Sequence, residues 1–275
     1  MNLLHSIILR VTAALLGCML SVSFAGDADA ESPVMSARDL AASLSARRDG
    51  TSYVRLRLDV KQPNDTAKIA LQIQIKQRRT KAASDLVYQV LWPKERKGEA
   101  VLLHETDGHP PTGWLFMPPD KLRSLEASQM NEPLFDGDLS YQDVIENFFA
   151  WENQAIVGNE VINRVSCIIL ESRPGKGEST PYSSVRSWID PSRLVPLRVE
   201  KYLASGGLAR RIETTRVATD DKGRFIPGTL TVHGSRADSV TNLEGSRIKH
   251  DVTYADREFT PEGLKETLAP SSAPE

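Results

Sequence analysis

The chain has 275 residues, a formal net charge of −2, and 25% charged residues. Acidic and basic residues are interspersed, so there is no basic stripe of the kind that binds nucleic acid or an anionic membrane surface. A hydrophobic fraction of 40% is enough for a sizeable core, which excludes a wholly disordered chain.

The first 25 residues are typical of an export signal. His5 and Arg10 precede an apolar run from 11 to 24, and the run ends in small residues that suit signal peptidase. We predict a signal peptide at 1–25 and an exported, soluble mature chain. No later stretch reaches the ~20 apolar residues that a membrane-spanning helix needs, so we do not expect an integral membrane protein.

Cys18 leaves a second processing route open. The sequence LLGC at 15–18 resembles a lipobox, whose cysteine would become the acylated first residue of an anchored lipoprotein. The apolar run continues past Cys18, which favours simple cleavage. After that cleavage Cys167 is the one remaining cysteine, so no internal disulfide can form, and its apolar surroundings predict a buried strand position.

Residues 36–48 are expected to form an amphipathic helix, because Leu40 and Leu44 lie four apart among polar residues and Asp49-Gly50 follows. From residue 51 onward the apolar period changes from about 3.6 to 2, which indicates strands. The clearest strand is 67–76. Its isoleucines and leucine share one face, and the lysines and glutamines of the other face are predicted to contact solvent.

About eleven strands are predicted in total, and the links between them are short. Such links join antiparallel neighbours, because a parallel crossover needs a dozen or more residues. The sequence has no alternation of strands and helices, which argues against a doubly wound nucleotide-binding fold. The predicted strands are 53–60, 67–76, 86–92, 100–106, 114–118, 161–172, 185–190, 194–203, 208–217, 226–233 and 248–254.

One helix interrupts the strands in the middle of the chain. Ser140 and Asp143 are spaced as a helix N-cap and its capping-box partner. Val144, Ile145 and Phe148 follow at apolar positions, together with Phe149. We expect this apolar face to plug the open end of a barrel.

Catalytic signatures are absent from the sequence, which contains no HExxH, CxxC, GxSxG, P-loop or GxGxxG pattern. The densest group of ligand-type residues is HETDGH at 104–109, where two imidazoles and a carboxylate offer a metal site. The Asp107-Gly108 pair in the middle is a hairpin signal, and it favours a solvated β-turn instead. We therefore predict no metal, no cofactor and no enzymatic activity.

Large apolar side chains are the remaining candidates for function. Core packing is their ordinary role. However, a barrel of about eleven strands is wider than the eight whose side chains just fill the interior, which predicts a cavity. We expect this cavity to be lined by Ile69, Leu71, Ile73, Trp92, Trp114, Phe116, Val144 and Phe148.

A series of short motifs extends through most of the chain in a fixed order. They are GWLFMPP at 113–119, KLR at 121–123, FDGDLSYQDV at 135–144, SWID at 187–190, VPLRVE at 195–200 and FTPEGL at 259–264. Together they resemble the motifs of the uncharacterised branch of the outer-membrane lipoprotein-sorting protein family.

The resemblance implies a fold similar to the lipoprotein carriers LolA and LolB. The chain would be mainly β, with residues 26–268 forming an incomplete antiparallel β-barrel whose concavity is plugged by helices, and with a disordered tail at 269–275. It implies a periplasmic carrier that binds the acyl chain of a lipid or lipoprotein and serves an RND-type inner-membrane transporter. A periplasmic scaffold or accessory subunit of an envelope transport complex, without its own ligand, is the alternative.

Overall fold

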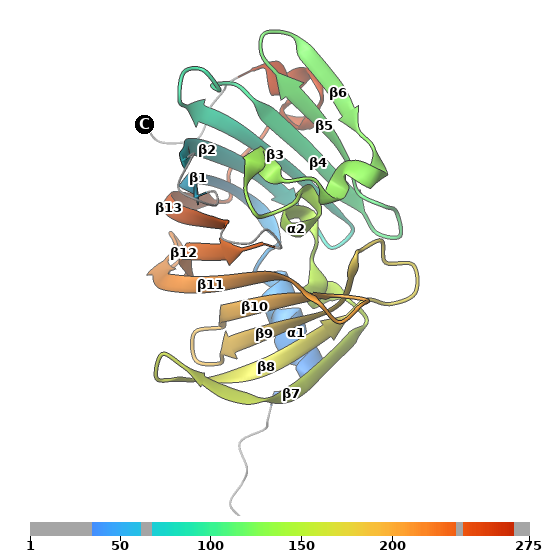
Figure 1. Ribbon diagram of the computed structural model, residues 1–275, viewed down its shortest axis with the longest axis vertical. Coiled ribbons are helices and arrows are strands. Elements are labelled where there is room, and N and C mark those ends of the chain that lie inside the picture. Colours follow the sequence, from blue (N-terminus) through green and yellow to red (C-terminus); the bar gives the residue numbers. More distant parts are fainter. Residues whose placement is uncertain (1–34, 62–67, 235–238, 267–275) are drawn as a thin grey trace, which may run out of the picture. The chain divides into compact units, whose positions relative to one another are not determined.

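The period-2 pattern of the sequence produces a thirteen-stranded sheet in which every neighbouring pair is antiparallel (Figure 1). This computed structural model describes residues 35–61, 68–234 and 239–266; the predicted signal peptide and tail lie outside them. The strands are β1 (Gly50–Lys61), β2 (Lys68–Arg79), β3 (Ala83–Trp92), β4 (Ala100–Thr106), β5 (Thr112–Met117), β6 (Lys121–Leu125), β7 (Asn153–Ile162), β8 (Val165–Arg173), β9 (Tyr182–Asp190), β10 (Val195–Leu203), β11 (Leu208–Thr219), β12 (Phe225–His233) and β13 (Val240–His250).

The sheet consists of two meanders, β1 to β6 and β7 to β13, joined side by side through β1 and β13. β6 and β7 form its two ends and do not pair with each other, so the sheet stays open. This arrangement confirms the predicted class, a mainly β protein with an incomplete antiparallel barrel. Among the described residues, no helix combines the length and the apolar character needed to cross a bilayer.

The predicted strand count was too low because the edge strands lack a clear apolar period. β6 and β7 are mostly exposed, and the prediction omitted β6 and fused the end of β7 with β8. The turn between β7 and β8 is formed by Asn163 and Arg164 at φ 50° and 68°, and Gly158 lies inside β7 at a bulge. The predicted last strand, 248–254, was also wrong: β13 ends at His250.

Helices cover the concave side of the sheet. The N-terminal helix is α1 (Ala37–Ala46), and Ser36 caps it by accepting a hydrogen bond from the Asp39 amide. The chain then crosses the concave side from β6 to β7 through residues 126–152, which we call the crossing segment (Figure 1). Its helices are η2 (Ala127–Asn131), η3 (Leu134–Asp136), α2 (Tyr141–Ile145) and η4 (Phe148–Ala150).

The opposite face of the sheet is also covered, by the C-terminal helices η5 (Asp256–Phe259) and η6 (Glu262–Lys265). Gln74 and Lys76 were predicted to contact solvent, but both are buried on this face. The Gln74 amide bonds Tyr53 and Gln89, and the Lys76 ammonium lies 2.7 Å from the Glu258 carboxylate. The alternation within β2 could not reveal that η5, about 180 residues later in the sequence, covers this face.

Candidate functional site

The concave face of β1 to β6 carries a broad group of buried apolar side chains. Its buried side chains form the α2 core, together with Met130, Leu134, Phe135, Tyr141 and Ile145 of the crossing segment. The sheet contributes Leu58, Val60, Leu71, Ile73, Leu86, Tyr88, Val90, Val101, Leu103, Leu115 and Leu125. The crossing segment therefore keeps water from a broad apolar surface that the sheet alone would expose.

The second half of the sheet packs on α1 through a separate group of side chains, the α1 core. Leu40 and Leu44 of α1 meet Phe148 and Phe149 of η4 there. Leu170, Tyr182, Val185, Ile189 and Val199 complete it from β8, β9 and β10. The two cores meet in the crossing segment, because α2 belongs to the first and η4 to the second.

Polar contacts fix the first turn of α2 to the second half of the sheet. The Asp143 carboxylate accepts hydrogen bonds from the Ser140 amide at 2.8 Å, Tyr182 at 2.7 Å and the Lys201 ammonium at 2.8 Å. Arg210 approaches the same carboxylate at 3.3 Å. Asp143 was predicted only to cap the helix; it also ties the helix to β9, β10 and β11.

Lys201 and Asp143 stabilise each other's charged forms. Burial on its own would raise the pKa of Asp143, but Lys201 and Arg210 lower it below its usual value. Burial on its own would lower the pKa of Lys201, but Asp143 and Glu146 raise it. Both groups are therefore ionised at neutral pH, and α2 is held by an ion pair inside the protein.

Arginines hold the other end of α2. Arg79 of β2 donates to the carbonyl oxygens of Ile145 and Val144, both at 3.1 Å. Arg48 donates to the Glu146 carbonyl at 2.9 Å. Guanidinium groups at this position satisfy the terminal carbonyls of a helix and complement its dipole. Helix α2 is thus anchored at both ends.

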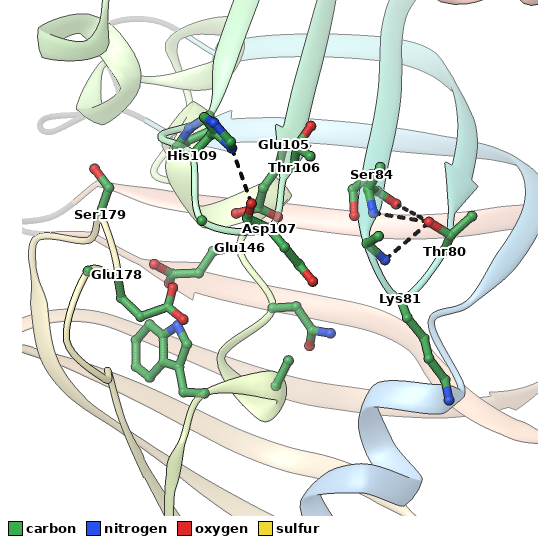
Figure 2. Close-up of a pocket in the computed structure, with 18 of the residues that line it drawn as sticks. Thr80, Lys81, Ser84, Glu105, Thr106, Asp107, His109, Glu146, Glu178 and Ser179 are labelled. Carbon is green, nitrogen blue, oxygen red and sulfur yellow. Dashed lines mark hydrogen bonds between the residues drawn. The ribbon is translucent and has the colours of Figure 1, made fainter.

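A polar cleft of about 420 Å³ opens beside the C-terminal end of α2 (Figure 2). Its walls are the β2–β3 turn at 80–84, the end of β4 and the following turn at 105–109, residues of α2 and η4, and the loop at 176–179. Glu146 and Glu178 are directed toward the same part of it. The cleft is lined mainly by charged and hydroxyl-bearing side chains, so it does not suit an acyl chain.

Glu105 is the unusual residue of this cleft. Burial raises its pKa to about 7, because the neighbouring Arg79 only partly offsets the loss of solvent. The pKa of Glu178 is also raised, by burial and by Glu146. The charge of the cleft therefore changes near neutral pH.

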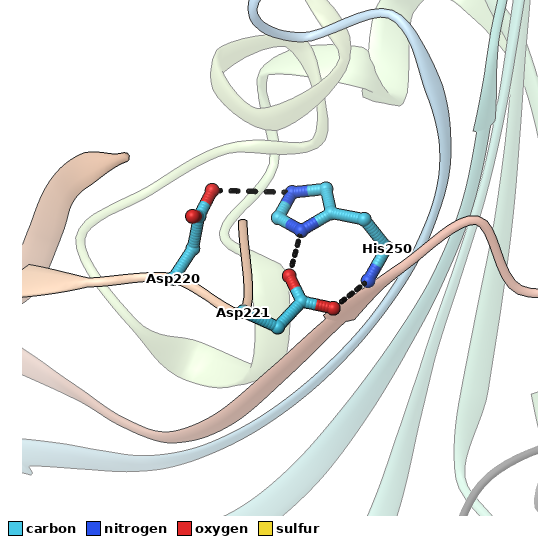
Figure 3. A group of neighbouring side chains, drawn as sticks. All are labelled: Asp220, Asp221 and His250. Carbon is cyan, nitrogen blue, oxygen red and sulfur yellow. Dashed lines mark hydrogen bonds and ion pairs between the residues drawn. The ribbon is translucent and has the colours of Figure 1, made fainter. Parts of the chain in front are cut away.

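Asp220, Asp221 and His250 are grouped so that their potential ligand atoms lie within 4.8 Å of one another (Figure 3). The His250 Nδ1 bonds Asp221, and its Nε2 lies 2.8 Å from the Arg224 guanidinium. Arg224 also bonds Asp220 at 2.8 Å. The Arg224 guanidinium lies between Asp220 and His250, where a metal cation would bind. We therefore interpret the group as a set of polar contacts that joins the β11–β12 turn to the end of β13.

The eight residues predicted to line a cavity do not form one group. Ile69, Leu71, Ile73 and Val144 lie together in or against the α2 core. Phe148 lies in the α1 core, and Phe116 is buried on the opposite face of the sheet. Trp92 and Trp114 are 53% and 37% exposed. The structure thus brings together the residues of β2 and α2.

Two local predictions near the site have different outcomes. The expected hairpin at Asp107-Gly108 is present between β4 and β5, and His104 bonds Asp85 at 2.6 Å. The expected helical face joining Val144 and Ile145 to Phe148 and Phe149 was wrong, because α2 ends at Ile145 and η4 begins separately at Phe148.

Lys201 and Arg79 were missed by the sequence analysis, although a signal existed. In the 195–203 strand, Lys201 stands at an alternate position whose other members are the apolar residues Val195, Leu197 and Val199. Arg79 likewise continues the phase of Ile73 and Ile75. A charged residue in the apolar phase of a strand indicates a buried partner from another element.

Comparison with known proteins identifies the family. The model of a family of uncharacterized proteins matches residues 83–266. The chain belongs to this family. Its fold is LolA-like, which confirms the resemblance inferred from the sequence motifs. No curated protein matches the sequence.

Three solved structures share this LolA-like fold. A DUF1329 family protein from Desulfovibrio piger has a TM-score of 0.76 and 21% identity, covering 83% of this chain and 97% of its own. An outer membrane lipoprotein-sorting protein domain from Vibrio parahaemolyticus has a TM-score of 0.73 and 18% sequence identity. The match covers 82% of this chain and 97% of that protein. A LolA superfamily protein from Nitrosomonas europaea has a TM-score of 0.66 and 20% sequence identity. The match covers 82% of this chain and 98% of that protein.

Proposed function

We propose that this LolA-like protein is a non-catalytic carrier that holds the acyl chain of a lipid or lipoprotein against the concave face of its sheet. The observation that carries the proposal is the α2 core. A broad apolar surface on β1 to β5 is covered by the irregular crossing segment and not by a second sheet. An acyl chain matches such a surface in chemistry, because burial of apolar area drives its binding.

The proposed location is the periplasm, supported by the export signal of the sequence and by the LolA-like fold. A carrier there needs a donor and an acceptor, and an RND-type inner-membrane transporter is the partner that the family resemblance favours. The polar cleft beside α2 lies at the boundary of the apolar face and offers a place for the polar part of a lipid.

Lipid extraction tests the proposal directly. Purified protein is extracted with organic solvent, and mass spectrometry is expected to detect stoichiometric acyl lipids. Binding of a fluorescent fatty acid is then compared between Leu71→Trp and Leu102→Trp, two buried leucines on opposite faces of the sheet. We expect Leu71→Trp to abolish binding and Leu102→Trp to retain it at equal stability. Absence of both lipid and probe binding contradicts the proposal.

A scaffold or accessory subunit is the second candidate, and the free edge of β7 favours it. Among the described strands, β7 pairs only with β8. Ile156, Val157 and Val161 of this edge are exposed apolar side chains. Free edges of this kind accept strands from partner proteins. If Val161→Lys abolishes assembly with envelope proteins while lipid is never recovered, the scaffold reading replaces the carrier.

A further inference from the structure

The crossing segment contains one strained turn, at residues 134–137. Pro133 and Ser140 are bridged, and the Leu134 amide donates to the Leu139 carbonyl at 2.7 Å, which makes a small hairpin. At its tip, Phe135 and Asp136 adopt left-handed backbone angles of φ 49° and 62°. Left-handed conformations are unfavourable for residues with a Cβ and persist where the surroundings impose them.

The phenyl ring of Phe135 is buried, although its backbone is left-handed. The ring lies in the α2 core, in the same cluster as Leu71 and Ile73 of the sheet. The next residue, Asp136, is directed outward: 62% of its side chain is exposed, and it pairs with Arg96 at 3.2 Å. The tip thus inserts one apolar side chain into the concave face and presents a polar one to solvent.

The C-terminal flank of the tip, residues 138–145, is held by buried polar contacts. The buried Asp138 carboxylate accepts hydrogen bonds from Ser239 at 3.0 Å and Thr241 at 2.8 Å. Beyond it, the ion pair of Asp143 with Lys201 and the contacts of Arg79 anchor α2. We therefore expect the tip at 135–136, and not α2, to be the part that moves.

We propose that the acyl-chain site lies beneath Phe135 and forms when a linear chain displaces the phenyl ring from the α2 core. The chain replaces the apolar contacts of the ring, and the tip is released from its left-handed conformation. Helix α2 stays in place as a fixed wall. The inference rests on the proposed carrier function and adds which part of the cover yields to the ligand.

Two variants and a fluorescent fatty acid test this site. Phe135→Gly removes the ring, and glycine tolerates the left-handed angles. Phe149→Ala is the matched control, a phenylalanine equally buried but in the α1 core. Removing a competing side chain raises the population of the open form, so we expect Phe135→Gly to bind on the order of fivefold more tightly than wild type. Phe149→Ala is expected to bind like wild type.

Hydrogen exchange on the wild-type protein supplies a second readout. On addition of the fatty acid, amides at 134–139 are expected to lose protection, and amides at 141–147 to keep it. Equal binding by wild type and Phe135→Gly, or loss of protection across α2, overturns the inference and leaves the carrier function intact. Binding by neither protein overturns the carrier function and the inference with it. Weaker binding by Phe135→Gly also overturns the inference, because the ring would then contact the ligand and not compete with it.

Discussion

The Lys201 ammonium lies 2.8 Å from the Asp143 carboxylate, and the two side chains are 1% and 0% exposed. The pair joins β10 to the first turn of α2, and therefore joins the second half of the sheet to the cover of the first half. The two residues are 58 positions apart in the sequence. Because breaking a buried ion pair is costly, this pair holds the crossing segment against β10.

Removal of one partner is expected to be costly. Lys201→Met leaves Asp143 and Glu146 without their shared cation, and an uncompensated buried charge of this kind costs about 3–5 kcal/mol of unfolding free energy. Lys222→Met is the control, because its pair with Asp251 is exposed, and we expect a loss of about 0–1 kcal/mol. Urea denaturation of both variants measures the difference; equal losses would contradict the anchoring role of Lys201.

Glu105 is expected to make stability depend on pH. Its pKa is raised from the ordinary glutamate value to about 7 in the folded state, so the folded state favours the protonated carboxyl. The stability that Glu105 contributes by staying protonated is fully present below about pH 4.5, and it is lost as the pH rises through about 7. Glu105→Gln cannot ionise, and we expect it to be more stable than wild type at pH 8 by on the order of 2 kcal/mol.

Denaturation curves at pH 4, 6 and 8 test this dependence. The two proteins are expected to converge in stability at pH 4, to separate as the pH rises from about 4.5 to about 7, and to keep a constant difference above that. Glu95→Gln, at an exposed position, should follow the wild-type curve throughout. A constant difference between Glu105→Gln and wild type across the range would show that Glu105 does not titrate in this window.

Phe259 packs the C-terminal helices η5 and η6 against the face of the sheet opposite the crossing segment. Its ring centroid lies 5.3 Å from that of Tyr254, and the Arg78 guanidinium lies 4.6 Å above it. Phe259→Ala is expected to cost about 3–5 kcal/mol, as for other buried aromatic truncations. Phe225 is the matched control, with an arginine 5.5 Å from its ring but 43% exposure. Thermal unfolding should show a clear loss for Phe259→Ala and little change for Phe225→Ala.

Export and processing are tested by the mass of the mature protein. Cleavage after Ala25 predicts a chain that begins at Gly26 and carries no lipid. Intact-mass measurement of protein isolated from the periplasmic fraction checks both points. A mass that begins at Cys18 with added acyl groups would establish the lipid-anchored alternative.

Several features were predictable because they depend on neighbours in the chain. The alternation of Ile69, Leu71 and Ile73 determined a strand and its buried face, and the Ser140 and Asp143 spacing determined a helix start. Short turns such as Asp107-Gly108 determined antiparallel hairpins. The succession of antiparallel strands follows from these patterns, which operate over a few residues.

The tertiary structure decided how distant segments meet. β1 pairs with β13, the C-terminal helices bury Gln74, and Lys201 and Arg79 converge on α2. In the sequence Gln74 looked like a solvent contact, because alternation alone does not distinguish an exposed face from a face that a later segment covers. Lys201 and Arg79 stand in the apolar phase of their strands, but the strand pattern does not name their partners. The sequence by itself therefore determined most of the strands, the antiparallel pairing of chain neighbours and the apolar face of β2. Only long-range packing decided what covers that face, because the free energy of a buried ion pair depends on the register of strands far apart in the chain.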